Sequence, residues 1–298
     1  MKITGTFIDE ISHDIPSANW GKSEWARDFD VMKSVGIDTV ILIRCGYRDK
    51  MSYDSAVIKR NITVRPVYID LVNIFLDEAE RCDMDFYFGL YDSGKYWHEG
   101  NYQKETDINV ALAEEAVARY GNRSAFRGWY ASHELHAYHE GQLKLTANIC
   151  EALREIRNQP ILMSPYVKGR KQFEDPVTPE MHEQQWNLIF SALEGKVDYV
   201  AFQDGQVDFS KLEEYTEINT GLARKHGIVP WANIESFERG MPIDFLPIDW
   251  RNLKMKMDIA ARAGVSKLIT FEFSHFMSPH SMYPSAHYLF DRYVEMIK

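Results

Sequence analysis

Short apolar segments alternate with longer amphipathic segments along the whole sequence, and this alternation restricts the possible folds more than any other feature. The short segments have the length of strands, and the β-branched run Thr39–Ile43 is typical of a strand covered on both faces. The longer segments repeat apolar residues at helical spacing. Gly36 and Gly121 stand where two of the expected helices end.

Eight segments of each kind follow one another in strict alternation. The expected strands are Ile3–Ile8, Thr39–Ile43, Asp85–Leu90, Phe126–Ala131, Pro160–Ser164, Val197–Gln203, Val229–Ile234 and Lys267–Phe273. The expected helices are Ser23–Val35, Leu71–Arg81, Asn109–Tyr120, Leu143–Arg157, Glu180–Leu193, Leu212–His226, Asn252–Ala263 and Tyr288–Met296. Strands that alternate with helices form parallel βαβ units, and eight such units close naturally into a barrel. We therefore predict an α/β protein with a single (β/α)8 TIM barrel.

A doubly wound open sheet is the alternative, but the glycine-rich phosphate turn expected after its first strand is absent from the sequence. No linker or low-complexity tract divides the chain, so we expect one domain over residues 1–298. The formal net charge of -10 disfavours nucleic acid and anionic membrane surfaces as partners. A neutral or cationic small molecule is easier to reconcile with this charge.

The three cysteines, Cys45, Cys82 and Cys150, are widely spaced and odd in number, which predicts neither a disulfide framework nor a CxxC metal site. The first residues read as a strand rather than a secretion signal. No apolar run approaches the roughly 18 residues of a membrane helix. These features predict a reduced, cytoplasmic protein without a membrane span.

The active site of such a barrel lies at the carboxyl ends of its strands. Most of the expected strands are followed by side chains that can form hydrogen bonds or transfer protons. Trp20 and Trp97 lie in polar loops, where an exposed aromatic face could stack on a sugar ring, whereas Trp129 and Trp231 lie inside strands and are expected to pack in the core. The residues expected to bind substrate are Asp9, Trp20, Arg44, Tyr91, Trp97, His133, Tyr166, Gln203, Asp204, Asn233 and Glu272.

Two further carboxylates stand out because an aromatic strand runs directly into each of them. Glu134 ends the segment Arg-Gly-Trp-Tyr-Ala-Ser-His-Glu, and Glu235 ends Val-Pro-Trp-Ala-Asn-Ile-Glu. The fourth and seventh strands face each other across a barrel mouth, so both carboxylates can reach one ligand. Glycoside hydrolysis needs such a pair. One carboxyl group would protonate the leaving oxygen, and the other would attack the anomeric carbon or activate water. A salt bridge at the rim is the alternative for each.

Glu272 lies in the alternating segment Thr-Phe-Glu-Phe-Ser near the end of the eighth expected strand. The alternation places Phe271 and Phe273 toward the helices and leaves Glu272 pointing into the barrel near its top. A buried inward carboxylate must be paired or functional. We therefore expect Glu272 to bind substrate or support the residues that do.

The histidines near Glu134 suggest a metal-binding site. His133, His136 and His139 are three residues apart, a spacing that differs from the His-Glu-x-x-His motif. A histidine-rich loop that lines a polar cleft is the favoured interpretation, and we expect no metal and no cofactor.

At these residues the sequence resembles the barrel glycoside hydrolases, and specifically the bacterial DUF4434-type proteins proposed to be glycosyl hydrolases. The resemblance covers most of the chain and rests on Ile3–Asp9, the region of Trp20 and Trp25 with Met32–Val40, and Gly128–Glu134. By resemblance to the large retaining clan of barrel hydrolases, Glu134 matches the acid/base position and Glu235 the nucleophile. We therefore predict that Glu134 is the general acid/base, with a pKa raised by an apolar surround, and that Glu235 is the nucleophile or stabilising base. That clan usually has Asn before the first Glu, where this sequence has His133.

The sequence thus favours hydrolysis of a glycosidic bond in a small carbohydrate or oligosaccharide. A metal-dependent sugar isomerase or epimerase, with carboxylate and histidine ligands, is one alternative. A non-catalytic carbohydrate-binding barrel is the other.

Overall fold

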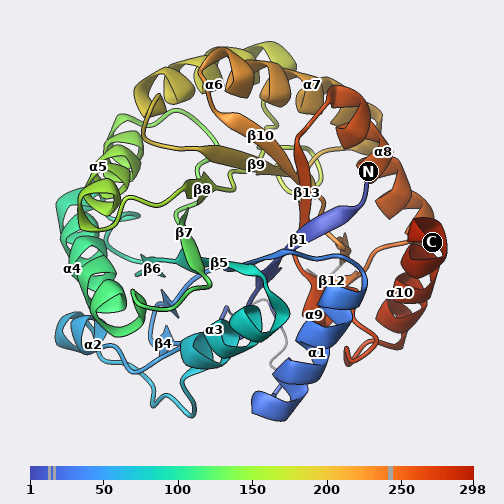
Figure 1. Cartoon of the computed structure of the whole chain (residues 1–298). Helices are drawn as coiled ribbons and strands as arrows, with labels where there is room; N and C mark the ends of the chain where they lie inside the picture. The colour runs from blue at the N-terminus through green and yellow to red at the C-terminus, as the bar shows by residue number, and fades with distance from the viewer. Residues whose placement is uncertain (13–14, 16–17, 241–243) are drawn as a thin grey trace.

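The computed structural model describes residues 1–12, 15, 18–240 and 244–298. Its centre is a closed barrel of eight parallel strands, paired in the order β1, β13, β10, β9, β8, β7, β5, β2. Figure 1 looks roughly along this barrel, with the helices forming a ring around the strands. The predicted (β/α)8 barrel is confirmed. The barrel strands are β1 Ile3–Ile8, β2 Thr39–Leu42, β5 Asp85–Gly89, β7 Phe126–Ala131, β8 Ile161–Met163, β9 Tyr199–Gln203, β10 Val229–Asn233 and β13 Lys267–Thr270.

The helices begin and end at residues whose side chains or backbone conformations favour those positions. The Asp70 side chain accepts a hydrogen bond from the backbone N–H of Asn73 and so caps α3. Gly36 follows α1 with a φ of +86°, and Gly264 ends α8 with a φ of +80°, where a side chain would be strained. The helices are α1 Lys22–Ser34, α2 Ala56–Asn61, α3 Leu71–Cys82, α4 Tyr102–Tyr120, α5 Glu140–Ile156, α6 Pro179–Leu193, α7 Phe209–Lys225, α8 Trp250–Ala263, α9 Phe273–Phe276 and α10 Pro284–Ile297.

The alternation of side chains along the barrel strands divides the apolar core around these strands into an outer and an inner part. Trp129 packs in the outer part, between strands and helices, with its ring centroid 4.9 Å from that of Phe126. Trp231 packs inside the barrel and stacks on Tyr199 at 4.4 Å. Both tryptophans therefore lie in the core, as the sequence predicted. The buried residues of the inner part are Phe7, Ile41, Ile43, Tyr87, Tyr130, Leu162, Ala201 and Ile269.

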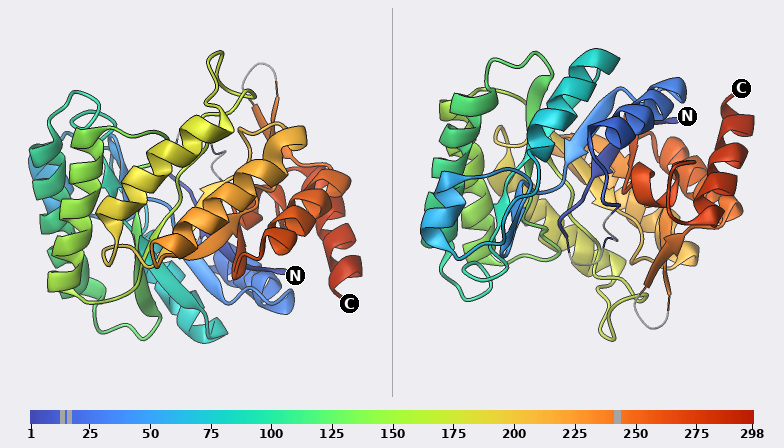
Figure 2. Two further views of the ribbon diagram at one scale, coloured as in Figure 1. Left: turned by 90° about the horizontal axis from the view of Figure 1, so that it is seen from above. Right: turned by 90° about the horizontal axis from the view of Figure 1, so that it is seen from below.

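Two small additions to the barrel escaped sequence analysis. Strands β3 (Gly46–Tyr47), β4 (Lys50–Met51) and β6 (Tyr91–Asp92) form a small sheet, and β11 (Phe237–Gly240) and β12 (Asp244–Pro247) form an antiparallel hairpin. Pairings of two to four residues leave too short a pattern to read from the sequence. Figure 2 shows the hairpin and the loop between β8 and α6 projecting from the same end of the barrel.

The three cysteines are buried and free. Within the described part of the chain, no helix combines the length and apolar character that crossing a membrane requires.

Candidate active site

A cavity of about 280 Å³ opens at the carboxyl ends of the barrel strands. It brings together side chains that follow β1, β2, β7, β8, β9 and β10, as a site at this end of a barrel should. Glu134 comes from the loop after β7 and Glu235 from the loop after β10, so both carboxylates line the same space. The residues predicted for the site that line the cavity are Asp9, Arg44, Trp97, Glu134, Tyr166, Gln203, Asn233 and Glu235.

A buried arginine holds Glu134. The Arg44 Nη2 atom lies 3.1 Å from Glu134 Oε1, and its Nε atom lies 3.6 Å from Asp92 Oδ2. Burial alone would lower the pKa of Arg44, but the charges of Glu134 and Asp92 outweigh burial and raise that pKa above its ordinary value. The environment of Glu134 therefore includes the positive charge of Arg44, and the predicted apolar environment is wrong. A guanidinium at this distance favours the ionised form of the carboxyl.

Asp92 connects this pair to the aromatic side of the cavity. Its Oδ1 atom accepts hydrogen bonds of 2.8 Å from Trp97 Nε1 and from the backbone N–H of Gly94. Burial raises the pKa of Asp92, but the neighbouring His133 and Arg44 outweigh burial and lower it. Asp92 is thus an ionised, fixed wall of the cavity. These bonds hold the Trp97 ring at the cavity, but the ring is only 7% exposed.

Asp92, Glu105 and His133 form the one group in the described ranges whose ligand atoms are close enough together to hold a metal ion, within 4.8 Å of one another. The Glu105 carboxylate already accepts bonds from the Ser93 backbone N–H at 3.0 Å and from the Ser93 hydroxyl, and its Oε1 lies 2.9 Å from His133 Nε2. Trp97 packs edge-on against the His133 ring at 5.3 Å. Because protein donors already occupy the carboxylate oxygens, this group fits a buried hydrogen-bond network better than a metal centre.

The other histidines of the segment contact different groups. His136 stacks on Tyr166 with ring centroids 4.9 Å apart, and His139 caps the first turn of α5. The three histidines therefore do not converge on one point near Glu134.

Glu235 is buried against the loop that follows β9. Only 2% of its surface is exposed, and its Oε2 atom lies 1.7 Å from the position that a Cβ atom on Gly205 would occupy. Glycine is therefore required there for the carboxylate to keep its place. The backbone N–H of Glu235 donates to Asp204 Oδ1 at 3.1 Å, and Lys256 Nζ donates to the Glu235 carbonyl oxygen at 2.9 Å.

Several buried oxygens of the cavity wall have no hydrogen-bond partner among the described residues. They are Asp9 Oδ2, Gln206 Oε1 and Asn233 Oδ1, from residues that are 1%, 3% and 2% exposed. The other Asp9 oxygen accepts 3.0 Å bonds from the backbone N–H groups of Ile11 and Ser12, which fix its orientation. Buried acceptors are costly unless a donor satisfies them. A ligand rich in hydroxyl groups supplies such donors.

One side of the cavity is apolar, and sequence analysis did not predict it. Phe7 from β1, Phe271 after β13, and Phe237 and Phe245 from the β11–β12 hairpin form this side, which we call the phenylalanine wall. Phe237 contacts Phe245 at 4.4 Å and Phe271 at 6.0 Å between ring centroids. No signal short of the hairpin itself could have identified Phe237 and Phe245.

Five of the residues predicted to bind substrate do not line the cavity, and four of them are Trp20, Tyr91, His133 and Asp204. Trp20 packs on Trp25 at 4.9 Å, in the outer core. Tyr91 is fully buried, with its hydroxyl on the Arg48 carbonyl oxygen, and the next residue, Asp92, reaches the cavity instead. Because adjacent strand residues face opposite sides, only one of the two can do so. The other two, His133 and Asp204, support the cavity from behind through the bonds described above.

Glu272 does not point into the barrel as its alternation suggested, because β13 ends at Thr270. Phe271 lines the cavity, while the Glu272 side chain caps α9 by accepting bonds from the backbone N–H groups of Ser274 at 2.9 Å and His275 at 2.8 Å. Glu272 also contacts the His275 ring. Burial disfavours the charge on His275, but Glu272 outweighs burial and raises the pKa of His275 to about 9.

A family model described as "Domain of unknown function (DUF4434)" matches residues 3–283. No curated protein matches the sequence. The crystal structure of "a putative alpha-L-fucosidase" from Bacteroides thetaiotaomicron VPI-5482 is 46% identical with a TM-score of 0.95, over 100% of this chain and 94% of that chain.

More distant solved structures share the fold alone. An endo-1,4-beta-D-mannanase from Thermotoga petrophila RKU-1 is 8% identical with a TM-score of 0.57, over 91% of this chain and 87% of that chain. A beta-glucosidase from Thermotoga maritima is 10% identical with a TM-score of 0.55, over 87% and 79%.

The cavity therefore combines carboxylates able to transfer protons or attack a carbon atom, buried acceptors suited to hydroxyl groups, and an apolar wall suited to a C–H face. Arg44, the one arginine among the described residues that line it, is neutralised by Glu134 and Asp92.

Proposed function

The chain belongs to the DUF4434 family, and we propose that it hydrolyses a glycosidic bond in a small, neutral carbohydrate. The observation that carries this proposal is that Glu134 and Glu235 line one cavity, in which Asp9 Oδ2, Gln206 Oε1 and Asn233 Oδ1 are buried without a donor among the described residues. Sugar hydroxyl groups satisfy such oxygens, and a pair of carboxyl groups is what cleavage of a glycosidic bond requires. The likeness to a structure described as "a putative alpha-L-fucosidase" supports the same class of reaction.

The charge of the cavity favours a neutral sugar. Asp9, Asp92, Glu134 and Glu235 line it, and Arg44 is engaged by two of these carboxylates. A sugar acid would add a negative charge without finding a free cation among these residues. A neutral sugar can instead place hydroxyl groups on the buried acceptors and a C–H face or methyl group on the phenylalanine wall.

The environments of the two carboxyl groups support different roles for them. Arg44 favours the ionised form of Glu134, which suits a group that attacks the anomeric carbon or deprotonates a water molecule. Glu235 is 2% exposed, and burial favours the neutral form of a carboxyl, which suits a proton donor to the leaving oxygen. This assignment reverses the roles expected from the sequence.

Aryl glycosides with good and poor leaving groups test the pair and its roles together. We would assay an aryl α-L-fucoside first and then a panel of neutral aryl glycosides, with wild type, Glu134→Gln, Glu235→Gln and the exposed control Glu214→Gln. A leaving group of low pKa needs no proton from the enzyme. We therefore expect Glu134→Gln to be inactive on both substrates, and Glu235→Gln to retain activity only on the better leaving group.

The outcomes separate the hypotheses. The opposite pattern would restore the roles expected from the sequence. Full activity of both variants would exclude the pair, and tight sugar binding by wild type without turnover on any substrate would favour a binding protein.

A further inference from the structure

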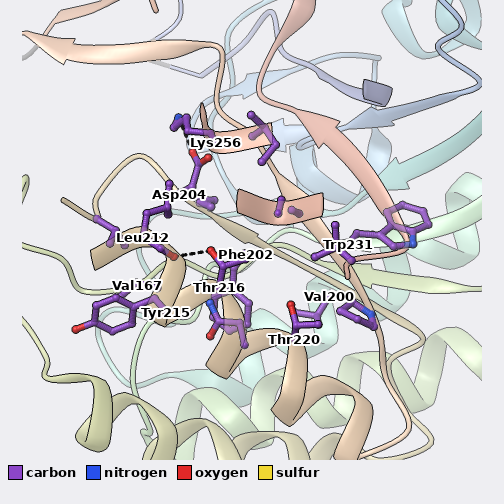
Figure 3. A pocket seen from close by; sticks show the side chains of 18 residues that line it. Val167, Val200, Phe202, Asp204, Leu212, Tyr215, Thr216, Thr220, Trp231 and Lys256 are labelled. Atoms are coloured by element: carbon purple, nitrogen blue, oxygen red, sulfur yellow. Dashed lines mark hydrogen bonds and ion pairs between the residues drawn. The ribbon is translucent and has the colours of Figure 1, made fainter. Parts of the chain in front are cut away.

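We propose that the buried pair of Lys256 and Asp204 is a positioning device that holds Glu235 in place through its backbone. The inference rests on the role proposed above for Glu235. It concerns two residues that do not line the large cavity and cannot touch a substrate there. They lie instead on a separate cavity of about 30 Å³ between β9, β10, α7 and α8. Figure 3 shows Lys256 and Asp204 next to each other at one end of this small cavity.

The contacts of the pair converge on a single residue. Lys256 Nζ lies 2.7 Å from Asp204 Oδ1 and donates to the Glu235 carbonyl oxygen at 2.9 Å. The same Asp204 oxygen accepts the Glu235 backbone N–H at 3.1 Å. Both backbone polar groups of Glu235 are therefore held by one ion pair. The pair links the loop after β9 to the loop after β10 and both to α8.

The side chain of Glu235 lies against Gly205, the residue after Asp204. The carboxylate occupies the space that a side chain at position 205 would take. The segment 204–205 thus meets Glu235 at two points. The Asp204 carboxylate accepts its backbone N–H, and the missing side chain of Gly205 leaves room for its carboxylate. Moving Asp204 would shift both contacts.

Stability alone gives little reason for this arrangement. Only 1% of the Lys256 side chain and 9% of the Asp204 side chain are exposed. Burying two charges costs about as much as their attraction returns, and well-packed apolar residues often replace such pairs with equal or greater stability. A buried ion pair does, however, fix the orientation of the groups that form hydrogen bonds with it, which apolar contacts do not. Here its two hydrogen bonds hold the Glu235 backbone at the edge of the large cavity.

Lys256 is therefore a positioning residue rather than a catalytic one. Its ammonium group is buried, is directed at Asp204 and Glu235, and stays outside the large cavity. A displacement of about 1 Å in a reacting group can cost about 100-fold in rate. Loss of the pair should therefore lower kcat and leave KM nearly unchanged, because the cavity-lining groups that hold the sugar remain.

The test replaces both charges together, so that neither is left buried alone. We would compare wild type with Lys256→Met/Asp204→Leu, in which the small cavity beside Asp204 offers room for the larger side chain. The matched control is Arg154→Met/Asp198→Leu, which removes an ion pair where α5 meets the start of β9. The assays are kcat and KM on the substrate found above, thermal unfolding, and a crystal structure of the double variant.

We expect the double variant to fold and to lose about 100-fold in kcat, with KM changed less than about threefold, while the control keeps kcat. Lys256→Arg retains the charge and should give an intermediate kcat. If the double variant fails to fold, this single variant still tests the proposal. A double variant or Lys256→Arg with the wild-type kcat would overturn the proposal.

Failure of the proposed function would look different, because wild type itself would then cleave no glycoside. In that case the crystal structure decides, since the proposal requires Glu235 to move when the pair is removed. An unmoved Glu235 overturns it, whatever reaction the protein catalyses.

Discussion

The guanidinium of Arg44 lies 3.1 Å from Glu134 and 3.6 Å from Asp92, and so joins two carboxylates that would otherwise repel each other. The Arg44 side chain is only 12% exposed, so solvent screens these charges weakly. This contact makes the state of Glu134 depend on a residue that is 90 positions away in the sequence.

Replacement of Arg44 by Met should therefore change how activity depends on pH. Without the cation, the ionised form of Glu134 loses the stabilisation that Arg44 provides, and the charge of Asp92 is no longer compensated by Arg44. We expect kcat/KM to fall by about 100-fold or more, and the acid limb of its pH profile to move up by roughly one pH unit. The exposed Arg292→Met serves as the control. An acid limb that stays in place would show that Arg44 does not set the state of the essential carboxylate.

Gly205→Ala should abolish most activity without unfolding the protein. The new methyl group would lie 1.7 Å from the present position of Glu235 Oε2, so the carboxylate must leave its place. We expect kcat to fall by about 100-fold with little change in the midpoint of thermal unfolding. Gly221→Ala, a helical position with open space around it, is the matched control. Activity equal to wild type in Gly205→Ala would mean that the position of Glu235 is unimportant.

The phenylalanine wall should contribute to substrate binding. Phe245 is 7% exposed and lines the cavity, whereas its neighbour Leu246 is 45% exposed. Truncation of Phe245 to Ala removes an aromatic contact worth about 1 kcal/mol or more to a sugar face, so KM should rise about tenfold while kcat changes little. Leu246→Ala should leave both parameters unchanged. Equal effects of the two substitutions would indicate a general disturbance of the hairpin.

His182 should make the fold sensitive to acid. Burial lowers the pKa of His182 to about 4 from an ordinary 6.5, although a 2.6 Å contact with Asn219 opposes the shift. Between these two values the unfolded chain binds a proton that the folded chain resists, so stability present above pH 6.5 is lost as the pH falls to 4. The loss should amount to about 2–3 kcal/mol in the free energy of unfolding.

Chemical denaturation of wild type and His182→Phe from pH 7 to pH 4 measures this effect. The variant should lose less stability over that range, because it has no proton to take up at this position. If the free energies of unfolding of the two proteins fall in parallel with pH, groups other than His182 cause the acid sensitivity.

The barrel and the positions of two of its carboxylates could be predicted from the sequence. Eight strand-like segments gave the barrel, and the positions of Glu134 and Glu235 after two of them were enough to place both on one cavity. Prediction failed where a strand ended earlier than its pattern suggested. Glu272 lies two residues beyond the end of β13, so the alternation that pointed it inward no longer applied. It failed for Trp20 as well, because an aromatic residue in a polar loop can equally pack on the outer core.

Local periodicity determined the elements of this protein, because each strand or helix must match its apolar residues to its own repeat and this match can be read within a short window. The order of the elements predicted the barrel. The barrel in turn predicted the end at which the site lies. The partners of the site residues were decided only by the tertiary structure. Arg44 beside Glu134 and Lys256 beneath Glu235 are contacts between segments far apart in the sequence, and no short-range pattern specifies them. The charge state and position of each carboxylate depend on those contacts, which exist only once the barrel has closed.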